Sequence, residues 1–173
     1  MNNIPSSKEC IDLLNKSGCS HSVIRHCRAV RNLAVKIAKR TNANVELVEA
    51  GALLHDIGRS KTHGILHGFE GAKIARDLKL PNSIIRIIER HVGAGIPIED
   101  AKKLGLPVKD YMPKSIEEKI VCHSDNLIDN SRRHMIENEI EKANKQGYKK
   151  YAKRLRKLHD ELSDLCGLDL NNI

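Results

Sequence analysis

Ionisable side chains occur in this sequence where helical periodicity predicts buried apolar ones. His26, His91 and Asp125 each continue a stripe of apolar residues spaced three or four apart, and the pair His55-Asp56 follows a fourth such stripe. Burying an unpaired imidazole or carboxylate is costly, so these side chains are expected to share a partner. Imidazole nitrogens together with carboxylate oxygens favour Zn, Mn, Fe or Ni over Ca and Mg. The spacing therefore predicts a transition-metal site built by several helices.

Each of these residues has a simpler explanation when it is taken alone. A single inward-facing histidine is more often a hydrogen-bonded core residue than a metal ligand. A His-Asp dipeptide is common by chance, and Asp125 could cap a helix or form a salt bridge. Only the joint occurrence of the pattern on several helices favours a metal centre.

The elements that must position these side chains are helical. Apolar residues recur at a period near 3.6 almost throughout, and no segment alternates at a period of two. Serine, threonine or asparagine side chains at the expected starts, and glycines at the expected ends, predict the helix boundaries. Helices are expected from Ser6 or Ser7 to about Asn15, after Ser20, from Asn44 to a stop at Gly58, over 70–78, from Pro81 to Gly93, from Ser115 to about Asp129, and as one or two basic helices over 132–166.

Two segments interrupt this helical pattern. Residues 59–69 are polar and contain glycine, which predicts a loop, and residues 95–113 carry prolines and glycines with at most one or two helical turns near 99–104. Ser115 followed three residues later by Glu118 predicts a capping box. Because no interdomain linker is visible, we predict one all-α domain with an N-terminal helical segment (1–19), a core (20–133) and a basic C-terminal helical extension (134–173).

Composition excludes several classes of protein. The 173 residues include only four aromatic ones, which argues against a platform that binds nucleic acid by stacking on bases. Five cysteines without a CxxC pair argue against a disulfide framework or a zinc ribbon and indicate a reducing, cytoplasmic location. We expect no membrane association, because no signal peptide and no long apolar run is present. Sequence patterns of P-loop, dinucleotide-binding or serine-hydrolase sites are absent as well.

The net charge of +8 is concentrated in one segment. Residues 132–157 hold ten lysines and arginines against three glutamates, almost the whole excess. Such a surface attracts phosphorylated ligands, including nucleic acid. A solvated helix face that merely keeps the protein soluble is an equally good explanation.

His26, then His55-Asp56-Ile57-Gly58, then Asp125 resembles the H…HD…D signature of the HD-domain metal-dependent phosphohydrolases, in their HDIG branch. The resemblance covers about Ser20 to Arg133. It implies a single-domain HD-type helical bundle, here with additional C-terminal helices. It also implies that His26, His55, Asp56 and Asp125 bind a divalent metal.

Two further histidines resemble positions of the family that hold a second metal or a phosphate. His67 stands in HGFEGAKIA and His91 in ERHVGAG, although some relatives have a second histidine where this chain has Val92. The implied cofactor is one or two ions of Fe, Mn, Zn, Ni or Co. The stretch IEEKIVCHSDNLIDNSRR also resembles bacterial HD hydrolases that cleave diadenosine tetraphosphate symmetrically.

The resemblance implies hydrolysis of a phosphoester or phosphoanhydride of a nucleotide by a metal-activated water. Asp56 would be the catalytic residue that orients the water or accepts its proton. Arg59, where relatives commonly have lysine, would bind a substrate phosphate. Arg132 and Arg133 would reach a second phosphate, or would simply complement a helix dipole.

Two alternatives without turnover stay open at this stage. The protein could be a module that senses a nucleotide, or one that binds nucleic acid through its basic C-terminal helices. The sequence leaves the substrate, the native metal and the oligomeric state open. His21, His63, His134 and His159 have no place in the motif. All four are expected at the surface, with a position next to a ligand as the alternative for His63.

Overall fold

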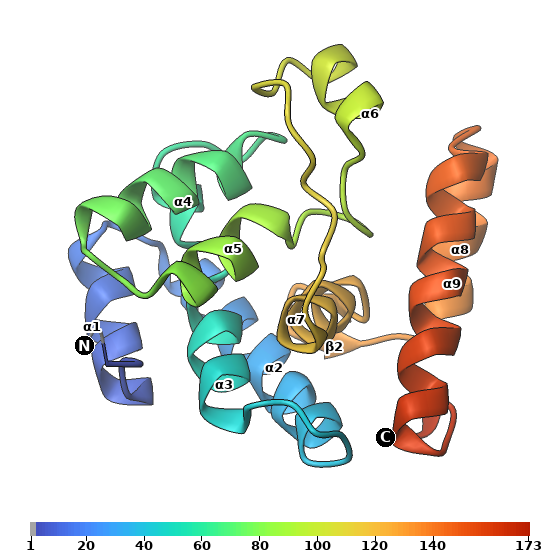
Figure 1. Cartoon of the computed structure of the whole chain (residues 1–173), viewed down its shortest axis with the longest axis horizontal. Coiled ribbons are helices and arrows are strands. Elements are labelled where there is room, and N and C mark those ends of the chain that lie inside the picture. The colour runs from blue at the N-terminus through green and yellow to red at the C-terminus, as the bar shows by residue number, and fades with distance from the viewer. Residues whose placement is uncertain (1–2) are drawn as a thin grey trace.

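The computed structural model describes residues 3–173, and most of these are helical (Figure 1). The only sheet among them is one antiparallel pair of two-residue strands, in which Asp129 pairs with Arg132. The prediction of an all-α fold is therefore confirmed. The elements are α1 (Ser7–Lys16), α2 (His21–Ala38), α3 (Val45–Leu54), the 3-10 helix η1 (Ile57–Ser60), α4 (His67–Asp77), α5 (Asn82–Arg90), α6 (Ile98–Lys103), α7 (Ile116–Asn126), β1 (Ile128–Asp129), β2 (Arg132–Arg133), α8 (Ile136–Lys145), α9 (Lys149–Cys166) and η2 (Leu170–Asn172).

Side-chain caps start four of these helices at the positions that the sequence predicts. The side chains of Ser6, Ser20, Asn44 and Ser115 each accept a hydrogen bond from the backbone N–H three residues on. Each cap satisfies a backbone donor that has no partner inside its own helix.

The capping box predicted at Ser115 forms only in part. Ser115 accepts a hydrogen bond from the Glu118 backbone N–H, as expected. The Glu118 carboxylate instead accepts one from the backbone N–H of Lys114 at 2.8 Å and pairs with Arg86 and Arg90 of α5. Glu118 thereby joins α7 to α5 rather than closing its own helix.

Gly58 does not end α3, which already stops at Leu54. A Cβ atom on Gly58 would lie 1.9 Å from the carbonyl oxygen of His67 and 2.5 Å from the backbone nitrogen of Gly71. Gly58 therefore permits α4 to lie against the segment that follows α3. This close approach brings His67, the first residue of α4, next to the His55-Asp56 pair.

The core is arranged around α7, which Figure 1 shows end-on near the centre of the molecule. One apolar cluster joins α2, α7 and α9 and includes Val30, Val121 and Leu155. A second cluster joins α1 to α5 and includes Leu14 and Leu53. The C-terminal helices thus share a core with the helices that carry His26 and Asp125. Among the described residues, no helix combines the length and apolarity needed to cross a bilayer.

Candidate metal centre

Several elements bring the predicted ligands to one place. His26 lies within α2, His55 and His91 directly follow α3 and α5, His67 begins α4, and Asp125 lies near the end of α7. His55 and His91 are fully buried, and Asp56 and His67 are nearly so. Most of these predicted ligands therefore lie at or next to the end of a helix, and only His26 lies well inside one.

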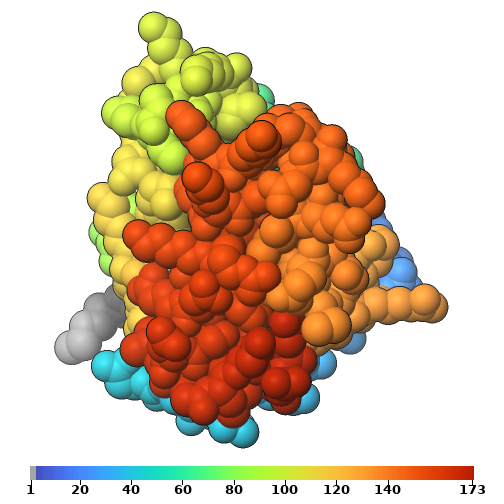
Figure 2. All heavy atoms as spheres, turned by 90° about the vertical axis from the view of Figure 1, so that its right-hand side faces the viewer, coloured from blue at the N-terminus to red at the C-terminus, as the bar shows by residue number. Residues whose placement is uncertain are grey.

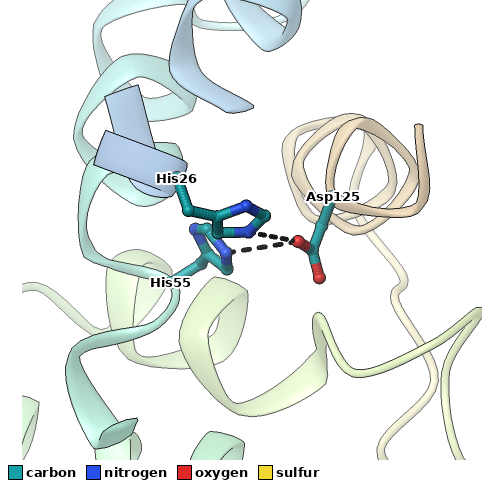
Figure 3. Close-up of side chains that lie close together, drawn as sticks. All are labelled: His26, His55 and Asp125. Atoms are coloured by element: carbon teal, nitrogen blue, oxygen red, sulfur yellow. Dashed lines mark hydrogen bonds and ion pairs between the residues drawn. The ribbon is translucent and has the colours of Figure 1, made fainter. Parts of the chain in front are cut away.

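His26, His55, Asp56 and Asp125 form the first group. The Asp125 Oδ1 atom lies 2.8 Å from His26 Nε2 and 3.4 Å from His55 Nε2, and both rings point at this carboxylate (Figure 3). The Asp56 Oδ2 atom lies 3.7 Å from His55 Nε2 and 3.8 Å from His26 Nε2. Two imidazoles and two carboxylates thus face a common centre.

His67 and His91 form a second group on the other side of Asp56. The Asp56 Oδ1 atom lies 3.3 Å from His67 Nε2 and 3.5 Å from His91 Nε2. The two Nε2 atoms are 3.0 Å apart. The two oxygens of Asp56 therefore face different groups, as expected of a carboxylate that could bridge two cations.

All four histidines are oriented in the same way by main-chain carbonyls. The Nδ1 atoms of His26, His55, His67 and His91 donate to the carbonyl oxygens of Asn130, Ala52, Gly64 and Ile88 at 2.7–2.8 Å. A proton on Nδ1 leaves an unprotonated Nε2 in each neutral ring, with its lone pair directed at the centre. This arrangement is typical of histidines that bind metals.

The polar atoms at the centre lack the partners that an empty core would require. His55 Nε2 and Asp56 Oδ1 are buried without a hydrogen bond. In neutral rings with Nδ1 protonated, His67 and His91 place two lone pairs 3.0 Å apart with no proton between them. Two nitrogens bound to one ion at ~2.1 Å and at a right angle would be separated by about 3 Å. The residues present therefore fit a divalent transition metal.

Charge coupling within the centre keeps its carboxylates ionised. Burial acts to raise the pKa of Asp56, but the facing His55 and His91 rings hold that pKa below its ordinary value. Burial is likewise outweighed at Asp125, whose pKa is held well below its ordinary value by His55 and His26. The carboxylates are thus in the form that binds cations.

The three arginines proposed from the sequence have different surroundings. Arg59 donates from Nε to Asp56 Oδ2 at 2.7 Å and from Nη1 to the carbonyl oxygen of His63 at 3.2 Å. Arg133 donates to the carbonyl oxygens of Leu170 and Ile173, so its guanidinium is committed to the C-terminal turn. Arg132 is exposed and lines the cavity described next.

A cavity of about 730 Å³ opens over the centre. His26, Asp56, Arg59 and Asp125 line it, as do the predicted Arg132 and Arg133. Sequence reasoning missed several lining residues, among them Arg25, Asn126 and Lys142. Arg25 and Asn126 directly neighbour the motif residues His26 and Asp125, and this adjacency in the sequence could have indicated that they line the cavity. Lys142 lies on α8, and nothing in its spacing indicates that it faces the cavity.

One histidine expected at the surface is buried. His159 on α9 is 2% exposed, and its Nδ1 lies 2.9 Å from Nε2 of the buried His123 on α7. Its Nε2 lies 3.0 Å from the Asp169 carboxylate. The surface prediction for His159 is therefore wrong, because α9 packs its apolar stripe, with His159 on it, against α7.

Comparison with known proteins identifies the fold. A family model described as "HD domain" matches residues 23–129. The HD domain of the Listeria monocytogenes phosphodiesterase PgpH, in complex with cyclic-di-AMP, superposes with a TM-score of 0.59 at 19% identity, covering 90% of this chain and 96% of that one. These matches leave the resemblance to diadenosine tetraphosphate hydrolases as a prediction.

Two relatives match most of the chain. A Thermoplasma volcanium protein named tRNA (cytidine(56)-2'-O)-methyltransferase is 46% identical over 170 residues, which are 98% of this chain and 50% of that protein. An uncharacterized protein of Methanocaldococcus jannaschii is 48% identical over 157 residues, which are 87% of this chain and 93% of that protein. The chain thus spans about half of the first relative and nearly all of the second.

Proposed function

The chain belongs to the HD domain family, and from this premise we propose that it hydrolyses a phosphoester or phosphoanhydride of a nucleotide with a divalent metal. His26, His55, Asp56 and Asp125 would hold the ion. The observation that carries the proposal is the convergence of histidine Nε2 atoms and carboxylates, among which His55 Nε2 and Asp56 Oδ1 are buried without a hydrogen bond. The phosphodiesterase name of the structurally similar PgpH supports the same reaction class.

His67 and His91 would hold a second ion, or a phosphate oxygen of the substrate, beside Asp56. Their distances to Asp56 Oδ1 are 3.3 and 3.5 Å, similar to those in the first group. The donor types suit Fe, Mn, Zn, Ni or Co. We therefore propose one or two ions of these metals.

A bound divalent cation supplies Lewis acidity, which lowers the pKa of water and neutralises charge on phosphoryl oxygens. Asp56 is the residue placed to position the attacking water, since its carboxylate is buried at the floor of the cavity. Its lowered pKa makes it an acceptor that orients the water rather than a strong base.

Arg59 would bind the phosphate group that is attacked. Its Nε holds Asp56, while the guanidinium lies at the cavity wall, where it can donate to phosphoryl oxygens. Guanidinium donors fixed before the reaction stabilise negative charge that develops on those oxygens. Arg59 would thus link the position of Asp56 to the position of the substrate.

The test is hydrolysis of a phosphoester panel by His55→Asn and Asp56→Asn variants in the presence of Mn²⁺. We expect both variants to lose at least about 100-fold in rate while circular dichroism shows a retained fold. His63→Asn is the matched control, because His63 lines the same cavity but belongs to neither ligand group. Full activity of either ligand variant on every substrate would overturn the proposal. Tight nucleotide binding by the wild type without product would instead favour a sensing module.

Nucleic-acid binding is a second candidate function, and helix α9 favours it. Lys149, Lys150, Lys153 and Lys157 are exposed, and in the described part of the chain none of them forms an ion pair. Figure 2 shows that α8 and α9 together form one face of the molecule. The name of the Thermoplasma relative suggests tRNA as the ligand.

Charge reversal tests this second function. Replacing the four lysines by glutamate is expected to weaken tRNA binding at least tenfold and to reduce its dependence on salt. Lys36→Glu on α2 with Lys39→Glu directly after it is the control, since these lysines are also exposed and unpaired in the described residues. Wild-type affinity that does not change with salt would contradict this function.

A further inference from the structure

The outer part of the cavity contains two guanidinium groups without a partner. Arg25 of α2 and Arg132 of β2 line the cavity, and in residues 3–173 neither side chain forms a hydrogen bond or an ion pair. The other two cavity arginines are committed, Arg59 to Asp56 and Arg133 to main-chain carbonyls. The two free groups are thus available to an anionic ligand.

Both arginines lie close to His26 in the fold: Arg25 precedes it on α2, and Arg132 follows a turn that contacts the His26 ring. The turn between β1 and β2 places the carbonyl oxygen of Asn130 2.7 Å from His26 Nδ1, the ring edge opposite to the Nε2 atom that faces Asp125. Asn130 adopts the left-handed conformation with φ +56, which asparagine tolerates well. Arg132 follows this turn, so it enters the cavity from the side of His26 that is remote from the ligands.

The acidic groups nearby do not cancel this charge. Asp129 accepts a hydrogen bond from the Asn130 side chain and forms no ion pair with an arginine in the described structure. Glu139 lies 3.9 Å from Lys142, the third cation of this region. Arg25 and Arg132 therefore remain uncompensated, and guanidinium groups bind phosphate in a bidentate manner.

We propose that Arg25 and Arg132 form a second phosphate subsite, so that the substrate carries a further phosphate one nucleoside away from the phosphate at the metal centre. This inference rests on the proposed function and narrows its substrate to compounds with two or more phosphates joined through nucleosides. A cavity of about 730 Å³ is large for a single phosphate group, since sites for whole small molecules measure ~300–1,000 Å³. Arg132 and Lys142 also lie beyond the segment that matches the family model.

Binding to the metal-free protein tests the subsite without relying on activity. The probes are diadenylate (ApA) and its phosphorylated forms pApA and ApAp, measured by calorimetry in the presence of EDTA. We expect at least one phosphorylated probe to bind about tenfold more tightly than ApA. Arg25→Gln and Arg132→Gln should each remove at least fivefold of this gain. Arg28→Gln, on the same helix but at a different surface pocket, should have no effect.

Steady-state kinetics with Mn²⁺ separate this inference from the proposed function. The two substitutions should raise KM for the phosphorylated dinucleotide and leave kcat/KM for bis(p-nitrophenyl) phosphate, which has one phosphate, unchanged. Cyclic di-AMP, tested in place of the linear probes, shows whether the subsite prefers a cyclic dinucleotide or the phosphorylated end of a linear strand. If no phosphoester is hydrolysed, the proposed function fails while the binding experiment still decides the subsite. If phosphorylated and unphosphorylated probes bind equally, or both variants bind like the wild type, the subsite is refuted.

Discussion

The orientation of each histidine ring is what makes this set of clustered side chains a candidate site for a cation. Main-chain carbonyls accept the Nδ1 proton of all four rings, so every Nε2 atom is directed inward. A hydrogen-bonded core histidine would use both nitrogens within the protein, whereas His55 Nε2 forms no hydrogen bond. A core histidine held by hydrogen bonds, which is the simpler explanation for each residue taken alone, therefore does not account for the group.

Arg59 is predicted to support activity in two ways, by positioning Asp56 and by binding the substrate phosphate. Arg59→Ala removes the 2.7 Å contact to Asp56 Oδ2 and is expected to lower activity ~10–100-fold, the usual effect of losing a group that orients a ligand. The measurement is kcat/KM on the best substrate of the panel. Arg28→Ala, an exposed arginine away from the cavity, is the control. An Arg59→Ala variant with the kinetics of the control would show that this contact is unimportant.

At the residue scale, the sequence predicted residues that the structure brings together and missed part of the cavity wall. His26, His55 and Asp125 were visible because an ionisable residue interrupts an apolar stripe. Arg25 and Lys142 were not, because an exposed cation on a helix is ordinary unless the cavity beside it is known. The commitment of Arg133 to the Leu170 and Ile173 carbonyls depends on tertiary packing that spacing does not encode.

Among the elements, the junction between η1 and α4 positions His67 of the second group. Gly58 lies so close to α4 that a methyl group would overlap main-chain atoms, which cannot move independently of the helix. From the sequence, Gly58 is expected to end the preceding helix, and the spacing of the apolar residues gives no indication of this contact. The role of the glycine in the HDIG string is therefore visible only in the structure.

Gly58→Ala is predicted to destabilise the protein and to disturb His67. We expect the free energy of unfolding to fall by about 3 kcal/mol or more, because main-chain atoms must shift to make room for the methyl group. This loss is at the upper end of the range for substitutions that overpack a core. Urea denaturation measures this loss. Gly64→Ala is the matched control, since a Cβ there meets nothing closer than 3.7 Å. Equal stability of the two variants would contradict the close approach of α4.

Glu118 is predicted to hold α5 against α7. Its carboxylate is buried and pairs with Arg86 at 3.3 Å and Arg90 at 2.9 Å. Glu118→Ala leaves both arginines without this partner and is expected to lower the free energy of unfolding by about 2–3 kcal/mol. This loss is somewhat smaller than for a fully buried pair, because Arg86 is half exposed. Urea denaturation against Glu46→Ala, an exposed glutamate of α3, provides the comparison. A difference below about 0.5 kcal/mol would be inconsistent with this role.

On the scale of the whole molecule, the C-terminal helices are part of the core and of the cavity. Leu155 and Leu162 of α9 share an apolar cluster with Val30 of α2 and Val121 of α7. The sequence predicted these helices and their charge but placed His159 at the surface, because the face that packs against α7 depends on how the chain folds back. Helix positions were thus largely predictable, and the packing between distant helices was not.

The cysteines are predicted to be inert in the folded protein. All five are free, and burial raises the pKa of the Cys19 thiol to about 11 and that of Cys10 to about 12. Burial also raises the pKa of Cys27, Cys122 and Cys166. Few thiolates then exist at pH 8, so a disulfide reagent should react slowly with the native protein and quickly with five thiols in denaturant. A fast-reacting thiol in the native state would be evidence against this packing.

The central claim is that the clustered imidazoles and carboxylates bind a divalent transition metal, and elemental analysis of the reconstituted, dialysed protein tests it most directly. We predict about one to two equivalents of metal in the wild type and in His63→Ala, and at least about one equivalent fewer in the doubly substituted His55→Ala, Asp125→Ala variant, which keeps Asp56, His67 and His91. Circular dichroism would verify that the variant is folded. A metal-free wild type, or a folded double variant that retains the full metal content, would contradict the account.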